Sequence, residues 1–84
     1  MGKKLYYPTN LPTIGMRAAW AIEERKVQTR KSMLNVRAEI DVTTVTLSNW
    51  RCGNTEPRGY HLRLMALAGY DVMWILTGEE DGKR

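Results

Sequence analysis

The chain is poor in the side chains on which catalytic and metal sites most often depend. It has 84 residues with one cysteine, Cys52, so an internal disulfide is excluded, and a single thiol fits a reducing compartment. One cysteine with one histidine, His61, is too few for a structural zinc site. No glycine-rich phosphate loop or nucleophile signature is present. We therefore expect no enzyme activity, no metal, no cofactor and no small-molecule substrate, with Cys52 and His61 as ordinary surface side chains.

Long apolar runs are also missing. No stretch approaches the ~20 apolar residues of a membrane span, and the first residues contain no apolar signal core. Tyr6 occupies the position at which a myristoylation pattern has Ser or Thr. We expect a soluble cytoplasmic protein without a membrane partner.

The charge that is present is basic and unevenly distributed. The net charge is +4, and residues 1–70 hold 11 Lys and Arg against 5 Asp and Glu, whereas residues 71–84 hold 2 against 4. A basic body indicates an anionic partner, with nucleic acid first, and a merely solubilising surface is the alternative. A chain of this length forms one domain with a modest core, which dimerisation would help to stabilise.

The spacing of apolar residues predicts a compact all-α bundle of about five short helices, because they recur every three or four residues. The predicted helices cover about 14–27, a segment capped by Thr29 or Ser32 and ending near Asp41, about 44–52, about 57–68 and about 71–77. The inward residues are expected to be Ile14, Ala18, Ala21, Ile22, Met33, Val36, Ile40, Leu47, Trp50, Leu64, Leu67, Ala68, Val72, Ile75 and Leu76. The β-branched run at 43–46 is strand-like but has no partner strand.

Capping residues set the predicted boundaries. Thr13 and Thr43 each offer an N-cap oxygen, and Pro57 can be the first residue of the fourth helix. Gly53 and Gly69 suit helix ends. The chain then divides into a flexible basic N-terminal arm (1–12), a helical domain (13–78) and a polar C-terminal tail (79–84). Arg17, Arg25 and Arg30 are expected on solvated helix faces, and Met16, Met65 and Met73 in the core or an interface.

The third predicted helix has an unusual outer face. If Leu47 and Trp50 point inward, the opposite side presents Thr44, Val45, Ser48, Asn49 and Cys52. A surface helix usually carries Lys and Glu there, and residues 44–49 contain neither. Asn49 can pair with adenine, the hydroxyls can donate or accept, and Val45 can pack on a thymine methyl group. These side chains suit the base edges of DNA.

Two stretches resemble a known family. "TTVTLSNWRCGNTEP" at 43–57, followed by "LRLMALAGYDVMWILTGEE", is similar to the lambda-repressor-like, or Cro/CI-type, helix-turn-helix regulators of phages and prophages. The segment 47–50 fits their recognition-helix pattern of Ile or Leu, Ser, any residue and Trp. Gly53 and Pro57 fit the loop, and 74–78 fits the family's Trp-Leu-Leu-Thr-Gly. The resemblance covers roughly residues 32–78.

Three residues depart from the family pattern. Arg37 stands where a small residue, usually Ala, packs between the two helices. Asp41 replaces the turn glycine, and Met33 replaces a glutamine that binds phosphate. About four extra residues also separate the first and second helices. Either Arg37 points outward or the helix pair is offset.

The resemblance implies a sequence-specific regulator of double-stranded DNA, a repressor that binds a palindromic operator as a homodimer near the nucleoid of a bacterial or phage-infected cell. The base contacts it implies come from Thr44, Val45, Ser48 and Asn49, with Trp50 in the core. The expected phosphate contacts come from Thr43, Arg51, Asn54 and Arg58, joined by Lys3 and Lys4 of the arm. The alternative for the arm is a disordered segment that takes no part in binding.

Two other functions stay open. One is an antitoxin or antirepressor-type protein-interaction module, which Tyr60, Tyr70 and Trp74 would favour if they were exposed and contiguous. The other is the DNA-binding part of a longer repressor.

Overall fold

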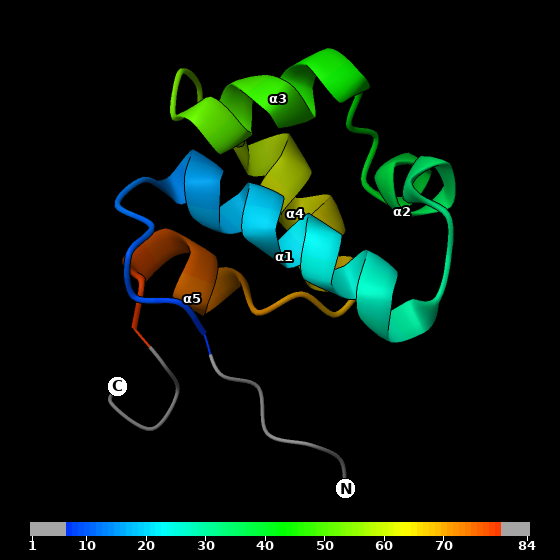
Figure 1. Ribbon diagram of the computed structural model, residues 1–84, viewed down its shortest axis with the longest axis horizontal. Helices are drawn as coiled ribbons and strands as arrows, with labels where there is room; N and C mark the ends of the chain where they lie inside the picture. The colour runs from blue at the N-terminus through cyan, green and yellow to red at the C-terminus, as the bar shows by residue number, and fades with distance from the viewer. Residues whose placement is uncertain (1–6, 80–84) are drawn as a thin grey trace, which may run out of the picture.

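A computed structural model describes residues 7–79, which form five α-helices and no strand within that range (Figure 1). The helices are α1 (Ile14–Thr29), α2 (Met33–Glu39), α3 (Thr44–Cys52), α4 (Gly59–Leu67) and α5 (Val72–Thr77). The predicted all-α fold is confirmed, and the strand-like run is the cap and first turn of α3. The Cα radius of gyration is 12.0 Å, which matches the ~12 Å of a compact domain of this length.

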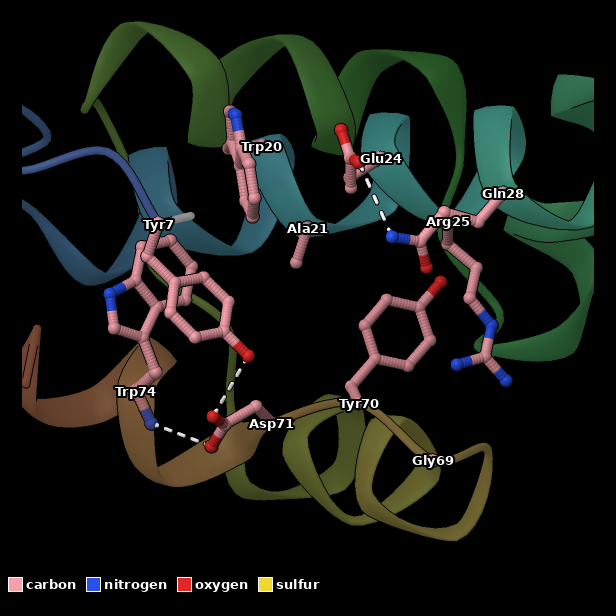
Figure 2. A pocket seen from close by; sticks show the side chains of 10 residues that line it. All are labelled: Tyr7, Trp20, Ala21, Glu24, Arg25, Gln28, Gly69, Tyr70, Asp71 and Trp74. Atoms are coloured by element: carbon pink, nitrogen blue, oxygen red, sulfur yellow. Dashed lines mark hydrogen bonds between the residues drawn. The ribbon is translucent and has the colours of Figure 1, made fainter. Parts of the chain in front are cut away.

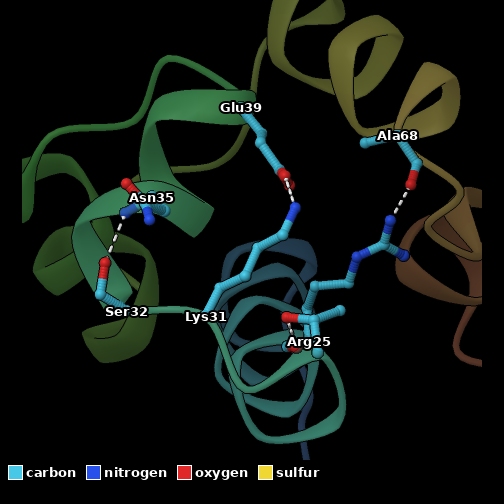
Figure 3. Close-up of polar contacts among 7 residues, drawn as sticks. Arg25, Lys31, Ser32, Asn35, Glu39 and Ala68 are labelled. Carbon is cyan, nitrogen blue, oxygen red and sulfur yellow. Dashed lines mark hydrogen bonds and ion pairs between the residues drawn. The ribbon is translucent and has the colours of Figure 1, made fainter.

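Local hydroxyls begin the first three helices. The side chains of Thr13, Ser32 and Thr43 each accept a hydrogen bond from the backbone amide three residues later, at 3.0, 3.1 and 3.1 Å. The cap of α2 is therefore Ser32 (Figure 3). Thr29 instead ends α1, where its hydroxyl donates to the carbonyl of Arg25 at 2.8 Å. Each cap satisfies a backbone donor that has no partner inside its helix.

The fourth helix differs from its prediction at both ends. Pro57 is buried in the preceding loop, and α4 begins at Gly59. Leu67 was expected inside but is 72% exposed, whereas Met65 is fully buried. Leu67 is the last residue of α4 and lies on a side of that helix that faces solvent. Leu76, near the end of the short α5, was also expected inside and is 39% exposed.

Helix α1 is the centre of the bundle. It packs against α2, α3 and α5, and α4 packs against α5. Figure 1 shows α3 and α5 on opposite sides of α1. The side chains that are essentially inaccessible to solvent are Ala18, Ile22, Val36, Ile40, Trp50, Met65, Trp74 and Ile75. No helix within residues 7–79 has the length and apolar character needed to span a bilayer.

Gly15 marks the closest approach in this packing. A Cβ atom there would overlap the carbonyl oxygen of Thr55 and lie 3.1 Å from that of Trp50. The start of α1 can therefore meet the end of α3 only because residue 15 has no side chain. Apolar periodicity gave no indication of this role.

Two α1 arginines expected in solvent instead hold other helices. Arg17 donates from Nε to the carbonyl of Ile75 and from Nη1 to that of Leu11, both at 2.8 Å. Arg25 donates to the carbonyl of Ala68 (Figure 3). Carbonyls at helix C-termini lack partners within their own helix, and a cation there is also favoured by the helix dipole. The predicted solvated faces are wrong for these two, whereas Arg30 is exposed.

Candidate nucleic-acid interface

Helix α3 has one buried and one exposed face. Leu47 is 4% exposed and Trp50 is 1% exposed, so these two residues attach the helix to the body, as predicted. On the other side, Thr44 and Ser48 are exposed, Val45 is 70% exposed and Asn49 is half-buried. Three of the four proposed base-contacting residues are therefore exposed, and Asn49 is partly covered by the protein.

The polar groups of this outer face have no hydrogen-bond partners in the described part of the chain. Among residues 7–79, the hydroxyls of Thr44 and Ser48 and the carboxamide of Asn49 make no hydrogen bond. By contrast, the hydroxyl of Thr43 donates to that of Thr46 at 3.0 Å while it caps the helix. The outer face can therefore form new hydrogen bonds without breaking internal ones.

The turn between α2 and α3 accommodates the unusual Arg37. Its side chain is half-buried and donates from Nη1 to the carbonyl of Val42 at 3.2 Å. Arg37 therefore does not point freely into solvent, because its guanidinium is bonded to the turn that follows α2. Ile40 and Val42, on either side of Asp41, are buried in the core. Asp41 adopts a left-handed φ of 56°, which Asp tolerates better than most residues.

Helix α4 is joined to this turn by a hydrogen bond between side chains. The hydroxyl of Tyr60 donates to the carboxylate of Asp41 at 2.7 Å. This hydrogen bond raises the pKa of Tyr60 above its ordinary value. His61 is half-buried, with its ring edge-on to Trp50 at 5.2 Å. The prediction that His61 is an ordinary surface residue is therefore wrong, because its ring packs against Trp50 of α3.

The residues expected to contact phosphate differ in their exposure and in the bonds that they already make. Arg51 forms an ion pair with Glu23 of α1, and both side chains are about half exposed. Arg58 is exposed and has no ion pair with any described residue, and Asn54 is exposed in the loop. Thr43 is used as a cap. Lys3 and Lys4 lie outside the described residues.

A second region gathers aromatic side chains at the opposite side of α1. Tyr7 stacks on Trp74 with ring centroids 4.5 Å apart, and Trp20 packs edge-on to both at 5.8 and 5.2 Å. The hydroxyl of Tyr7 donates to Asp71 at 3.0 Å. In the stretch 1–12, predicted as a flexible arm, Tyr7 therefore packs on the helical body.

Tyr70 also belongs to this aromatic region. The guanidinium carbon of Arg25 lies over its ring, 4.8 Å from the ring centroid. Tyr70 is 9% exposed, and its buried hydroxyl has no hydrogen-bond partner among residues 7–79. Burial raises the pKa of Tyr70 to about 12. Since Tyr70 and Trp74 are buried, they form no exposed patch with Tyr60.

Within the described chain, no three His, Cys, Asp or Glu side chains are placed to hold a metal ion, and Cys52 is an exposed thiol. Comparison with family models, with curated proteins and with solved structures gives no match to this chain.

Proposed function

We propose that the chain is a sequence-specific regulator of transcription that binds double-stranded DNA, of the phage or prophage repressor type. In this proposal α2, the turn at 40–43 and α3 form a helix-turn-helix, and α3 enters the major groove. The homodimer binds a palindromic operator, so the two copies of α3 lie ~34 Å apart, one turn of the DNA.

The outer face of α3 carries this proposal. It presents hydroxyls, a carboxamide and a valine methyl surface that are available to a partner, and it has no charged residue between positions 44 and 49. Bidentate bonding to adenine is open to Asn49, and Val45 suits a thymine methyl group. A face designed only for solubility would carry charges instead.

The charged groups support the same arrangement. Arg51 and Arg58 follow the neutral face in the sequence, and in this proposal they bind phosphates while the face reads bases. Glu23 must share or release Arg51 for this contact. Thr43 and Asn54 lie at the two ends of α3 and complete the set from the described residues. Lys3 and Lys4 would add contacts from the arm.

Base reading is tested by replacing Asn49 with Ala. A preferred site is first selected from a random DNA pool with the wild-type protein, and affinities for that site and for scrambled DNA are then measured by gel shift. Asn49→Ala should lower affinity for the preferred site by ~1–3 kcal/mol and relax the preference at one base pair per half-site. Binding to scrambled DNA should change little.

Gln28→Ala is the matched control, because Gln28 is an exposed carboxamide near the end of α1 whose side chain donates to Glu24 of the same helix. Equal discrimination by wild type and Asn49→Ala would show that Asn49 does not read bases. If no sequence is enriched from the pool, the function itself is refuted. The wild-type affinity should also fall steeply with salt, since neutralised phosphates release counterions.

The protein-interaction alternative lacks the feature that would favour it. An aromatic surface of Tyr60, Tyr70 and Trp74 was its expected signature, and only Tyr60 is exposed. DNA binding is therefore the function that we propose.

A further inference from the structure

The two ends of α3 are held to the protein by different contacts. The end of α3 lies against α1 at Gly15 and is joined to α1 by the ion pair of Arg51. The start of α3 follows directly on the turn at 40–43, so its position depends in part on how that turn is held. Two of the proposed base-contacting residues, Thr44 and Val45, lie at this start.

One side-chain hydrogen bond ties the turn to α4. Tyr60 donates from its hydroxyl to the carboxylate of Asp41 at 2.7 Å. Tyr60 is 54% exposed and Asp41 is also exposed, so this bond contributes its direction rather than buried area. The backbone of Asp41 is left-handed, with a φ of 56°. The bond is therefore made at the residue where the chain reverses between α2 and α3.

The ring of Tyr60 extends this link to the inner side of α3. It packs edge-on to His61 with ring centroids 5.3 Å apart, and His61 packs edge-on to Trp50 at 5.2 Å. Two adjacent residues at the start of α4 therefore connect to the turn before α3 and to the buried side of α3. A helix that is held at two separate places can neither tilt nor roll freely.

We infer that Tyr60 and Asp41 are positioning residues, which hold the start of α3 in the orientation at which its outer face reads base edges. The inference rests on the proposed DNA-binding function. Bidentate base contacts need a donor and an acceptor in place together, and a binding group must be held within ~0.5 Å of its productive position. Tyr60 and Asp41 act through α3 and contact no base themselves. Loss of their bond should therefore reduce discrimination between DNA sequences more than it reduces stability.

The test is Tyr60→Phe, which keeps the ring beside His61 and removes only the hydroxyl. Affinities for the site selected from random DNA and for scrambled DNA are measured by gel shift, and the ratio of the two is compared with that of the wild type. The ratio should fall by about threefold or more, the effect of one net hydrogen bond. Binding to scrambled DNA and the melting temperature should stay close to wild type, because the bond is exposed.

Tyr7→Phe is the matched control. The hydroxyl of Tyr7 donates to Asp71 at 3.0 Å in the aromatic region around α5 (Figure 2). This variant removes the same kind of bond without touching the turn before α3, so the ratio should keep its wild-type value. An unchanged ratio in Tyr60→Phe, or an equal fall in both variants, would overturn the inference.

Asp41 is tested by two substitutions that both tolerate its left-handed backbone. Asp41→Asn keeps an oxygen acceptor, so the ratio should be retained even though the lost charge raises affinity for both DNAs. Asp41→Gly removes the acceptor, so the ratio should fall as in Tyr60→Phe. When Asp41→Gly and Tyr60→Phe are combined, the loss should be no larger than in either variant alone. Additive losses would refute the pairing of the two residues.

A measurement without DNA separates this inference from the proposed function. The amides of Thr46 and Leu47 make the first hydrogen bonds of α3, and their hydrogen exchange should be faster in Tyr60→Phe. The amide of Ile75, bonded to Asp71 in α5, should exchange as in the wild type. If no sequence is enriched from the random pool, the proposed function fails. If a site is enriched and Tyr60→Phe discriminates as well as the wild type, only the positioning role fails.

Discussion

The outer face of α3 and the aromatic region around α5 differ in how far their side chains contribute to the packing of the protein. In the aromatic region, rings from before α1, from α1 and from α5 contact one another at 4.5–5.8 Å. On α3, the outward side chains of Thr44, Val45 and Ser48 make no hydrogen bond or ion pair with any described residue. One region therefore holds the fold together, and the other is held in place by the fold without contributing to it.

The largest expected difference comes from shortening one side chain on each face of α3 and measuring the stability of the two variants. Trp50→Ala should lower the free energy of unfolding by ~3–5 kcal/mol, because a large side chain that is 1% exposed leaves a cavity. Val45→Ala should change it by less than ~0.5 kcal/mol, since Val45 is 70% exposed. Thermal and denaturant melts followed by circular dichroism measure both. Comparable losses would show that the outer face also supports the fold.

Two glycines test how closely α1 and α3 must meet. Gly15→Ala should cost ~1–3 kcal/mol, because its Cβ overlaps the carbonyl of Thr55 and α1 must move away from α3. Gly59→Ala is the control at the start of α4, where a Cβ meets nothing within 4 Å. That change should stabilise by ~0.4–1 kcal/mol, since alanine restricts the unfolded chain more than glycine does. Equal melting temperatures for the two variants would contradict the close contact.

The smallest expected effect concerns the ion pair between Arg51 and Glu23, which links α3 to α1. Glu23→Gln releases Arg51, and an exposed pair of this kind is worth ~0.2–1 kcal/mol. If Arg51 contacts a phosphate, DNA affinity at low salt should rise by up to about fivefold. Glu39→Gln removes an equal charge from a different partner, Lys31, and should raise affinity less. An equal rise with both variants would indicate overall charge rather than a freed Arg51.

Local signals predicted much of the fold. Thr13 and Thr43 were identified as caps because a hydroxyl before an apolar helical pattern needs only its own neighbours to act. Leu47 and Trp50 were placed inside because their spacing of three defines a helix face. The choice between Thr29 and Ser32 could not be made, since both hydroxyls precede the same apolar pattern.

Contacts between distant segments were beyond the sequence patterns. Arg17 bonds to a carbonyl of α5 that lies 58 positions along the chain, so no periodicity in α1 could reveal it. Gly15 and Tyr7 likewise depend on which segment comes to lie beside them. For the proposed site, the exposed face of α3 was predicted, but the pairing of Arg51 with Glu23 and the bond from Arg37 to the turn were not. Long side chains select their partners only after the helices are packed.

The central position of α1 has a consequence for how the protein is made. Synthesis completes α1 before the helices that cover it, because α3 and α5 both follow it in the chain. An isolated helix of 16 residues is only marginally stable in water. The packing around α1 is therefore complete only after residues 72–77 have been made. We therefore expect a chain that stops before α5 to be less stable than the whole chain, because Trp74 and Ile75 are then missing from the core.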